Sequence, residues 1–267
     1  MTWSRLVLTD IDGSMISYSG DYTGIRESIE LLKSVKVKVI PVTAKTLAEV
    51  VYLDGKLDIG GGDLTAIVEM GGSICSKHYI IPGCDHVNIE GYKCCLIGRP
   101  LWEFKDHVVE ALRDCDYIAL SQASPQEAEV ILGIERGEAI LATKRVTLEV
   151  LWSQNIECLK AKLEKLKLRG LEITVGRRFI HVGTHYNKGA AVNKLIETPI
   201  FKGLNTIGIG DSEIDLEMLE TVEKSIIVPQ EDGTLRVKPR RSDHIIAPYP
   251  APKGWVWTSN MIALGLI

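Results

Sequence analysis

The sequence predicts an α/β fold, with a Rossmann-like parallel sheet core, helices on both faces of the sheet, and an inserted α+β domain. Three observations lead to this prediction. Short apolar runs alternate with helical patterns at the start of the 267-residue chain, and the same alternation returns near its end. Between about residues 82 and 176 the pattern is different. We therefore expect a core domain made of residues 1–82 and 177–267, with residues 83–176 inserted as a second domain.

The first part of the chain has the order strand, helix, strand, helix, strand. The run Arg5–Thr9 is apolar and has the length of a buried strand. Apolar residues at helical spacing, including Ile25, Ile29 and Leu32, predict the first helix. This first helix spans Gly24–Val35. The remaining predicted elements are the strand Lys38–Val42, the helix Leu47–Leu57 and the strand Ala66–Glu69.

The inserted part mixes helices and strands without regular alternation. Ser124, Pro125 and Glu127 form a capping box with proline at the first helical position, so a helix begins there. Gly170 closes a further helix. The other predicted elements are helices near Trp102–Arg113 and over Ile156–Arg169, and strands at Arg145–Trp152, Leu171–Val175 and Arg178–Val182.

The last part of the chain, like the first, alternates predicted helices and strands. Its predicted elements are the helices Lys188–Glu197 and Glu213–Val222, and the strands Thr206–Ile209, Ser225–Val228 and His244–Ala247.

Composition narrows the class of protein. With 45% hydrophobic and 25% charged residues the chain is typical of soluble globular proteins. It has no apolar run of about 18 residues and no signal-peptide pattern, so we expect a cytoplasmic protein without a membrane partner. A net charge of −4 argues against a nucleic-acid partner. The six cysteines form no C-x-x-C pair, and we expect buried reduced thiols.

Polar residues stand where the predicted parallel strands end. Asp10 and Asp12 follow the first strand, Thr43 follows the second, and Asp211 follows the strand Thr206–Ile209. Ligands bind beyond the carboxyl ends of such strands, so these side chains should converge, with Lys188 nearby at the start of a helix.

This set of residues suits phosphoryl transfer. One carboxylate can act as nucleophile and form an aspartyl-phosphate, and a second can protonate the leaving oxygen and then activate water. A hydroxyl and an ammonium can hold the phosphoryl oxygens, and a hard cation bound by oxygen ligands offsets the repulsion between anions. We expect Mg²⁺.

Four motifs resemble, in order, those of the haloacid dehalogenase superfamily of phosphatases. They are "DIDGS" at 10–14, "VTAKT" with Thr43, "NKG" with Lys188, and "GDSEIDLEML" with Asp211 and Asp215. The long insertion between the Thr and Lys motifs resembles the α+β cap of the branch that handles sugar phosphates. Within that branch, "TAKTLAEV", "EMGGSI", "GRRFIHVG" and "APKGWVWT" resemble the mannosyl-3-phosphoglycerate phosphatases.

The resemblance implies a magnesium-dependent phosphatase that hydrolyses mannosyl-3-phosphoglycerate, a small phosphorylated sugar acid. Asp10 would be the nucleophile and Asp12 the acid and base, while Thr43 and Lys188 bind the phosphoryl group. The metal would be held by Asp10, the Asp12 backbone carbonyl and Asp211, with Asp215 orienting Lys188 or a metal-bound water. The substrate-binding candidates are Lys45, Glu69, Arg178 and His181. Arg178 and Lys45 are the candidates for binding the glycerate carboxylate of the substrate, and Arg177 is a further candidate for the same role.

Three positions depart from the family pattern: Ile214 and Met70 replace asparagines, and Asn187 replaces an aspartate. The alternatives are a phosphatase of another sugar phosphate, such as glucosyl-3-phosphoglycerate or sucrose phosphate, a phosphomannomutase, or a catalytically silent sugar-phosphate binding protein. Oligomeric state stays open. His181 and His185 are predicted on a strand and its loop, so their four-residue spacing does not indicate a metal site.

Overall fold

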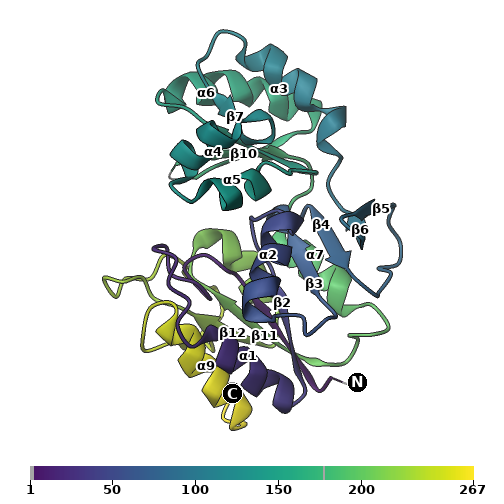
Figure 1. The fold of residues 1–267 in the computed structure, drawn as a ribbon, viewed down its shortest axis with the longest axis vertical. Coiled ribbons are helices and arrows are strands. Elements are labelled where there is room, and N and C mark those ends of the chain that lie inside the picture. The colour runs from purple at the N-terminus through teal and green to yellow at the C-terminus, as the bar shows by residue number, and fades with distance from the viewer. Residues whose placement is uncertain (1–2, 177) are drawn as a thin grey trace.

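The core of the protein is a five-stranded sheet in the order β13-β12-β11-β1-β2 (Figure 1). The computed structural model describes residues 3–176 and 178–267. Every neighbouring pair of strands in this sheet runs parallel, which confirms the predicted α/β core. The strands are β1 (Arg5–Thr9), β2 (Val37–Pro41), β11 (Asn205–Gly210), β12 (Lys224–Ile227) and β13 (Ile245–Ile246).

Helices cover both faces of this sheet because its inner strand β1 is apolar on both sides. Along β1, Val7 packs with the cluster under α1, α2 and α9, whereas Leu6 and Leu8 pack with the cluster under α7 and α8. Alternate residues of a strand point to opposite faces, so one continuous apolar run serves two cores. The helices are α1 (Ile25–Ser34), α2 (Leu47–Leu57), α7 (Lys188–Ile196), α8 (Leu216–Thr221) and α9 (Lys253–Ala263).

A second, antiparallel sheet extends the core in the order β3-β4-β6-β5. The bridge between Val42 and Ile67 joins it to the end of β2. Its residues Cys75 and Cys94 pack in one core cluster and Ile74 and Cys95 in the other. The strands are β3 (Thr65–Val68), β4 (Ser73–Ser76), β5 (His86–Ile89) and β6 (Tyr92–Leu96).

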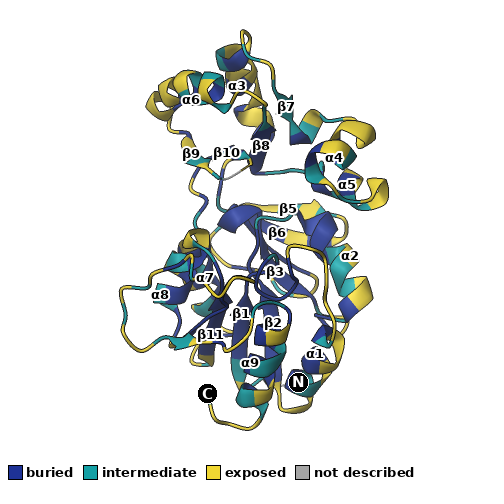
Figure 2. Cartoon of the chain, turned by 90° about the vertical axis from the view of Figure 1, so that its left-hand side faces the viewer, coloured by how far each residue is buried: buried dark blue, intermediate teal, exposed yellow. Residues whose placement is uncertain are grey.

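The cap is a four-stranded antiparallel sheet, β7-β8-β10-β9, with helices on both faces. Leu151 and Ile180 pack under α3 and α6, while Val150 packs under α4 and α5. Figures 1 and 2 show the cap as a separate body beyond the carboxyl ends of the core strands. Its elements are α3 (Lys105–Leu112), β7 (Ile118–Ala119), α4 (Pro125–Leu132), α5 (Arg136–Ala142), β8 (Leu148–Trp152), α6 (Ile156–Leu163), β9 (Glu172–Val175) and β10 (Ile180–Gly183).

Strand pairing places the domain boundaries differently from the expected ranges. β5 and β6 fall inside the predicted insertion, residues 83–176, but they hydrogen-bond within the core's second sheet. β10 falls inside the predicted core segment that begins at residue 177, but it pairs with β8 and β9 in the cap. Pairing depends on long-range register, which the local pattern around either boundary does not reveal.

The cysteines differ from the sequence-based expectation of reduced thiols, which is wrong. Disulfides join Cys75 to Cys94, Cys84 to Cys95, and Cys115 to Cys158. Cys75 and Cys94 face each other in the register of β4 and β6, although 19 positions separate them in the sequence. Only the folded arrangement brings these thiols together.

Helix ends mostly follow the local signals. α2 spans the predicted residues, and α4 begins at the predicted capping box of Ser124. The predicted helix over Ile156–Arg169 is α-helical to Leu163 and then continues as a 3₁₀ helix that Gly170 closes. Within residues 3–176 and 178–267, no helix combines the length and apolar character needed to cross a bilayer.

Candidate active site

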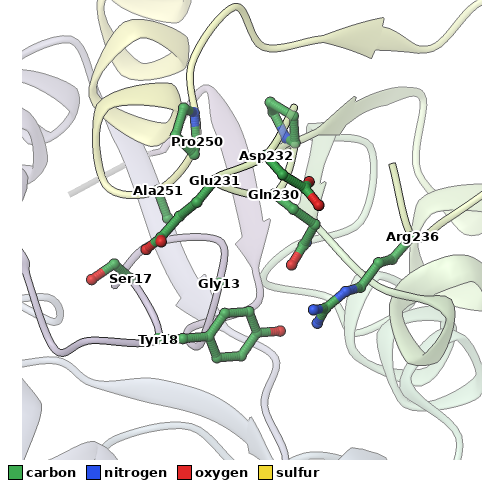
Figure 3. A pocket seen from close by; sticks show the side chains of 10 residues that line it. Gly13, Ser17, Tyr18, Gln230, Glu231, Asp232, Arg236, Pro250 and Ala251 are labelled. Carbon is green, nitrogen blue, oxygen red and sulfur yellow. The ribbon is translucent and has the colours of Figure 1, made fainter. Parts of the chain in front are cut away.

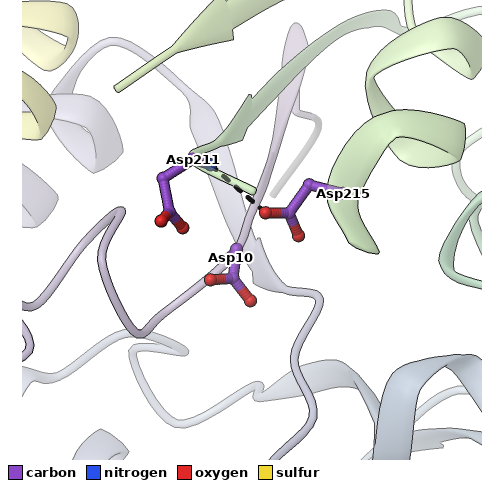
Figure 4. Close-up of side chains that lie close together, drawn as sticks. All are labelled: Asp10, Asp211 and Asp215. Atoms are coloured by element: carbon purple, nitrogen blue, oxygen red, sulfur yellow. Dashed lines mark hydrogen bonds between the residues drawn. The ribbon is translucent and has the colours of Figure 1, made fainter. Parts of the chain in front are cut away.

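Three buried carboxylates meet where the central core strands end. Asp10 follows β1 and Asp211 follows β11, and these strands are direct neighbours in the sheet. Asp215 lies in the 3₁₀ turn that leads into α8. One carboxylate oxygen from each residue lies within 4.8 Å of the others, and Figure 4 shows the three side chains converging. The predicted convergence of Asp10 and Asp211 is thus present in the fold.

Lys188 neutralises part of this cluster. It begins α7, and its Nζ lies 2.6 Å from Asp10 Oδ1 and 2.6 Å from Asp215 Oδ1. Burial alone would lower the pKa of Lys188, but the two carboxylates outweigh it and raise that pKa. Lys188 therefore stays charged and holds the Asp10 carboxylate in one orientation.

Asp215 holds the Lys188 ammonium in place. Its Oδ1 accepts from Lys188, while its Oδ2 accepts from the backbone N–H groups of Asp211 and Ser212 and from the Ser212 hydroxyl. A Cβ at Gly210 would lie 2.6 Å from the Asp215 Cβ, so a glycine is required there. One Asp215 oxygen thus accepts from the Lys188 ammonium while the other fixes the turn after β11, so Asp215 positions Lys188.

Three side chains hold Asp211. Its Oδ1 accepts from the Ser14 hydroxyl at 3.2 Å, and its Oδ2 accepts from the Tyr18 hydroxyl and Gln230 Nε2, both at 2.9 Å. Figure 3 shows Tyr18 and Gln230 lining the cavity of about 240 Å³ beside Gly13. Gly13 has φ +86°, and a Cβ there would lie 2.6 Å from both Asp211 Oδ2 and the Tyr18 ring. The glycine of the first motif therefore lets Tyr18 reach Asp211.

The charge balance of the cluster indicates a cation site. Burial raises the pKa values of Asp10 and Asp211, and the neighbouring carboxylates raise them further. Three carboxylates and one ammonium leave two excess negative charges when all are ionised. A divalent cation would balance them, and carboxylate oxygens are the donors that hard cations prefer. The donor set of Asp10 and Asp211 therefore fits such an ion.

Asp12 and Lys45 lie at the accessible edge of the cluster. The Asp12 side chain is 45% exposed, and its Oδ2 lies 3.0 Å from Lys45 Nζ. Lys45 Nζ also lies 3.7 Å from Glu49 Oε1. Burial would lower the pKa of Lys45, but the charges of Asp12 and Glu49 outweigh it and raise that pKa. Thr43 is fully buried at the end of β2, and its Oγ1 accepts from the Lys45 backbone N–H.

Glu69 is held by the connection between core and cap. Its carboxylate accepts from the backbone N–H groups of Val146, Thr147 and Leu148 and from the Thr147 hydroxyl. Glu69 is 1% exposed. Its contacts therefore connect the end of β3 to the segment that leads into β8 of the cap. They indicate a structural role for Glu69, not contact with the substrate.

Arg178 and His181 lie in the cap. The Arg178 guanidinium donates to the Ile131 carbonyl oxygen and lies 5.3 Å from the Phe179 ring centre. His181 Nδ1 is buried without a hydrogen-bond partner in the described part of the chain. Burial, helped by the charge of Arg145, lowers the pKa of His181 to about 4. Neither residue lines the described cavities that contain Asp12 or Lys188. Arg177 lies outside the described residues.

Sequence reasoning missed Tyr18, Gln230 and Arg145. Tyr18 and Gln230 reach Asp211 across 193 and 19 positions, and no motif marks either residue. Arg145 lies in the segment that leads into β8 of the cap, and its Nη1 donates to the Ala44 carbonyl oxygen at 2.9 Å. Ala44 is the residue between Thr43 and Lys45. A lone arginine carries no sequence signal for such a contact.

The three residues that depart from the family pattern line the same cavity. Met70, Asn187 and Ile214 all line a cavity of about 250 Å³ that also contains Lys188. Ile214 is 39% exposed.

Comparisons with known proteins show which families the chain is similar to. A family model described as haloacid dehalogenase-like hydrolase matches residues 153–246. The chain is 29% identical over 260 residues to "Mannosyl-3-phosphoglycerate phosphatase" of Aeropyrum pernix, covering 94% of this chain and 92% of the relative. It is 30% identical over 263 residues to "Glucosyl-3-phosphoglycerate/mannosyl-3-phosphoglycerate phosphatase" of Persephonella marina, covering 94% of each.

Solved structures share the fold at low sequence identity. A haloacid dehalogenase-like hydrolase from Bacteroides thetaiotaomicron superposes with a TM-score of 0.73 at 14% identity, covering 97% of this chain and 99% of that one. The "HAD Subclass IIB Sugar Phosphatase BT4131" superposes with a TM-score of 0.64 at 16% identity, covering 98% and 100%. These similarities extend over both core and cap.

Proposed function

Because the chain belongs to the mannosyl-3-phosphoglycerate phosphatase family of haloacid dehalogenase-like hydrolases, we propose that it hydrolyses a glycosyl-3-phosphoglycerate to the glycosylglycerate and phosphate. Membership confirms the resemblance that the sequence motifs carried, and the protein is a phosphoric monoester hydrolase. Mannosyl-3-phosphoglycerate is the substrate we favour. The observation that carries the proposal is the buried Asp10, held by Lys188 beside Asp211 at the end of the central strands.

In the first step an Asp10 oxygen attacks phosphorus, and the bond between phosphorus and the ester oxygen breaks. Asp12 gives its proton to the departing oxygen, which becomes the hydroxyl of the glycerate. In the second step Asp12 takes a proton from water as that water attacks the phosphorus of the aspartyl-phosphate. Phosphate leaves, and Asp10 is again a carboxylate.

The other residues support these steps. Lys188 keeps the Asp10 oxygen aimed and, with the Thr43 hydroxyl, binds phosphoryl oxygens. Mg²⁺ held by Asp10, the Asp12 backbone carbonyl and Asp211 would supply positive charge for the transferring group. Lys45 lies beside Asp12, where the leaving group departs, and we propose it as a substrate contact. The contacts of Glu69, Arg178 and His181 favour roles in shaping the cap.

A phosphate-release assay over a substrate panel tests the proposal. The panel contains mannosyl- and glucosyl-3-phosphoglycerate, sucrose phosphate, mannose 6-phosphate and p-nitrophenyl phosphate. We expect the highest kcat/KM on the glycosyl phosphoglycerates, complete loss of activity in EDTA, and recovery with magnesium. A preference for mannose 6-phosphate, or full activity after chelation, would contradict the proposal. No release from any ester would instead favour a sugar-phosphate binding protein.

Glucosyl-3-phosphoglycerate is the second candidate substrate, because the Persephonella marina relative is named for both glycosides. We propose that the enzyme acts in the cytoplasm on this small soluble substrate, without a nucleic-acid or membrane partner. Disulfides are rare in that compartment, although intracellular proteins of hyperthermophiles are an exception. Cell fractionation with an antibody against the chain tests the localisation.

A further inference from the structure

A cavity of about 240 Å³ lies between the core and the cap, beside Asp12. Because Asp12 protonates the leaving oxygen in the proposed mechanism, this cavity is where the glycosylglycerate part of the substrate would lie. The core side contributes Asp12, Lys45, Tyr52 and Lys56, and the cap side contributes Gly133, Ile134, Glu138 and Leu141.

Lys56 spans the two domains at this cavity. It lies near the end of α2, and its Nζ lies 2.9 Å from Oε1 of Glu138 on α5 of the cap. The same ammonium lies 4.2 Å from the centre of the Tyr52 ring. Both charged side chains are 36% exposed. Ion pairs this accessible to water are weak, so Lys56 can exchange one carboxylate for another at little cost.

Lys45, the other lysine of the cavity, is less available to bind a carboxylate of the substrate. Lys45 Nζ is held between two carboxylates of the core, Asp12 at 3.0 Å and Glu49 at 3.7 Å. The carboxylate partner of Lys56, in contrast, belongs to the cap. Movement of the cap would therefore free Lys56 while leaving Lys45 paired.

Two further contacts fix the position of Glu138 over the cavity. The Thr46 hydroxyl, at the start of α2, donates to the Leu141 carbonyl oxygen of α5 at 2.9 Å. Arg145 Nη1 donates to the Ala44 carbonyl oxygen at 2.9 Å. With α5 held in this way, the Glu138 carboxylate lies where an acid group of a ligand could contact Lys56.

We propose that Lys56 is a specificity residue that binds the glycerate carboxylate of the substrate, and that Glu138 occupies this position while the cavity is empty. The inference rests on the proposed function and adds the residue that recognises the second anionic group. The two carboxylates exchange on one ammonium, so no charge is left buried without a partner.

The test compares substrates with and without the acid group. The substrates are mannosyl-3-phosphoglycerate and p-nitrophenyl phosphate, with 3-phosphoglycerate and glycerol 3-phosphate as a smaller pair. The variants are Lys56→Met, Lys56→Arg and Glu138→Gln. Lys93→Met is the matched control, because Lys93 is exposed on β6 away from the cavity.

We expect Lys56→Met to raise KM about tenfold for the substrates that carry a carboxylate and to change KM little for the others, as expected for a charged hydrogen bond. Lys56→Arg should restore most of the affinity, and Glu138→Gln should lower KM for the acidic substrates because the competing carboxylate is gone. Lys93→Met should match the wild type.

Equal effects of Lys56→Met on acidic and neutral substrates would overturn the proposal, and an unchanged KM in Glu138→Gln would overturn the exchange of partners. Calorimetric titration of mannosyl-3-phosphoglycerate into Asp10→Asn, with and without Lys56→Met, measures binding without turnover. A wild-type enzyme that releases phosphate from no ester would refute the proposed function, whereas normal turnover with no selective Lys56 effect would refute only this inference.

Discussion

Replacing Asp10 with asparagine should abolish turnover and also raise the stability of the metal-free protein. At an effective dielectric constant of about 20, charges at most 4.8 Å apart repel each other by at least roughly 3.5 kcal/mol. Asp10 is thus repelled by Asp211 and Asp215 with a total of at least roughly 7 kcal/mol. Lys188 Nζ at 2.6 Å returns roughly 6 kcal/mol of attraction. These contributions nearly cancel, and the burial of the charge remains as a cost.

Asparagine removes that charge but keeps the shape and an oxygen that can accept from Lys188. We expect the free energy of unfolding in EDTA to rise by about 1–3 kcal/mol, which corresponds to a Tm increase of roughly 3–10 °C. Burial also raises the folded-state pKa of Asp10. A carboxyl with a raised folded pKa destabilises the protein as pH rises through the range between its unfolded and folded values. As pH rises above about 4, the usual value of an unfolded aspartate, Asp10→Asn should therefore lose less stability than the wild type.

Thermal denaturation with EDTA or with magnesium, beside a phosphate-release assay, measures both effects. Magnesium should raise the Tm of the wild type more than that of Asp10→Asn, because a ligand of the ion is weakened. Asp106→Asn, at an exposed position of α3, is the control and should leave Tm and turnover unchanged. A metal-free Asp10→Asn protein less stable than the wild type, or an equal magnesium shift in both, would refute the reasoning.

Four further predictions follow from single contacts. Gln230→Met removes a donor to Asp211 Oδ2 and should weaken magnesium binding about tenfold or more, as measured by calorimetry; unchanged affinity would show that Tyr18 and Ser14 suffice. The pKa of His181 is about 4 in the folded protein and near 6.5 in the unfolded chain. The contribution of His181 to stability is therefore complete above about pH 6.5, and on the order of 2–4 kcal/mol is lost as pH falls toward 4. His181→Gln should flatten the dependence of Tm on pH in that window, and a slope identical to the wild type would contradict the assignment. Glu69→Ala leaves the backbone donors of residues 146–148 without their acceptor and should cost at least about 2 kcal/mol in denaturant unfolding, with exposed Glu164→Ala as the silent control. Ile214→Asn should not reduce kcat, because Ile214 is part-exposed at the cavity wall; a large loss would show that the site depends on an apolar side chain there.

The sequence by itself determined the parts of the molecule that depend on local pattern. The apolar run of β1, the periodic face of α2 and the capping box of Ser124 appear in the structure where the sequence predicts them. These features depend on neighbours one to four residues apart, which a local reading captures. The meeting of Asp10 with Asp211 was also predictable, because both follow parallel strands whose carboxyl ends share one edge of the sheet.

Only the tertiary structure decided the contacts between distant segments. β5 and β6 join the core sheet, β10 joins the cap, and the cysteines pair across strands and helices. Tyr18 reaches Asp211, Glu69 accepts from the backbone that enters the cap, and Lys56 meets Glu138 across 82 positions of sequence. Such contacts depend on how loops close and strands register, and each partner alone resembles an ordinary surface or turn residue. The carboxylate cluster of the proposed active site was therefore predictable from motifs at strand ends. The contacts that support this cluster, and the proposed selection of substrate, depend on the packing of core against cap.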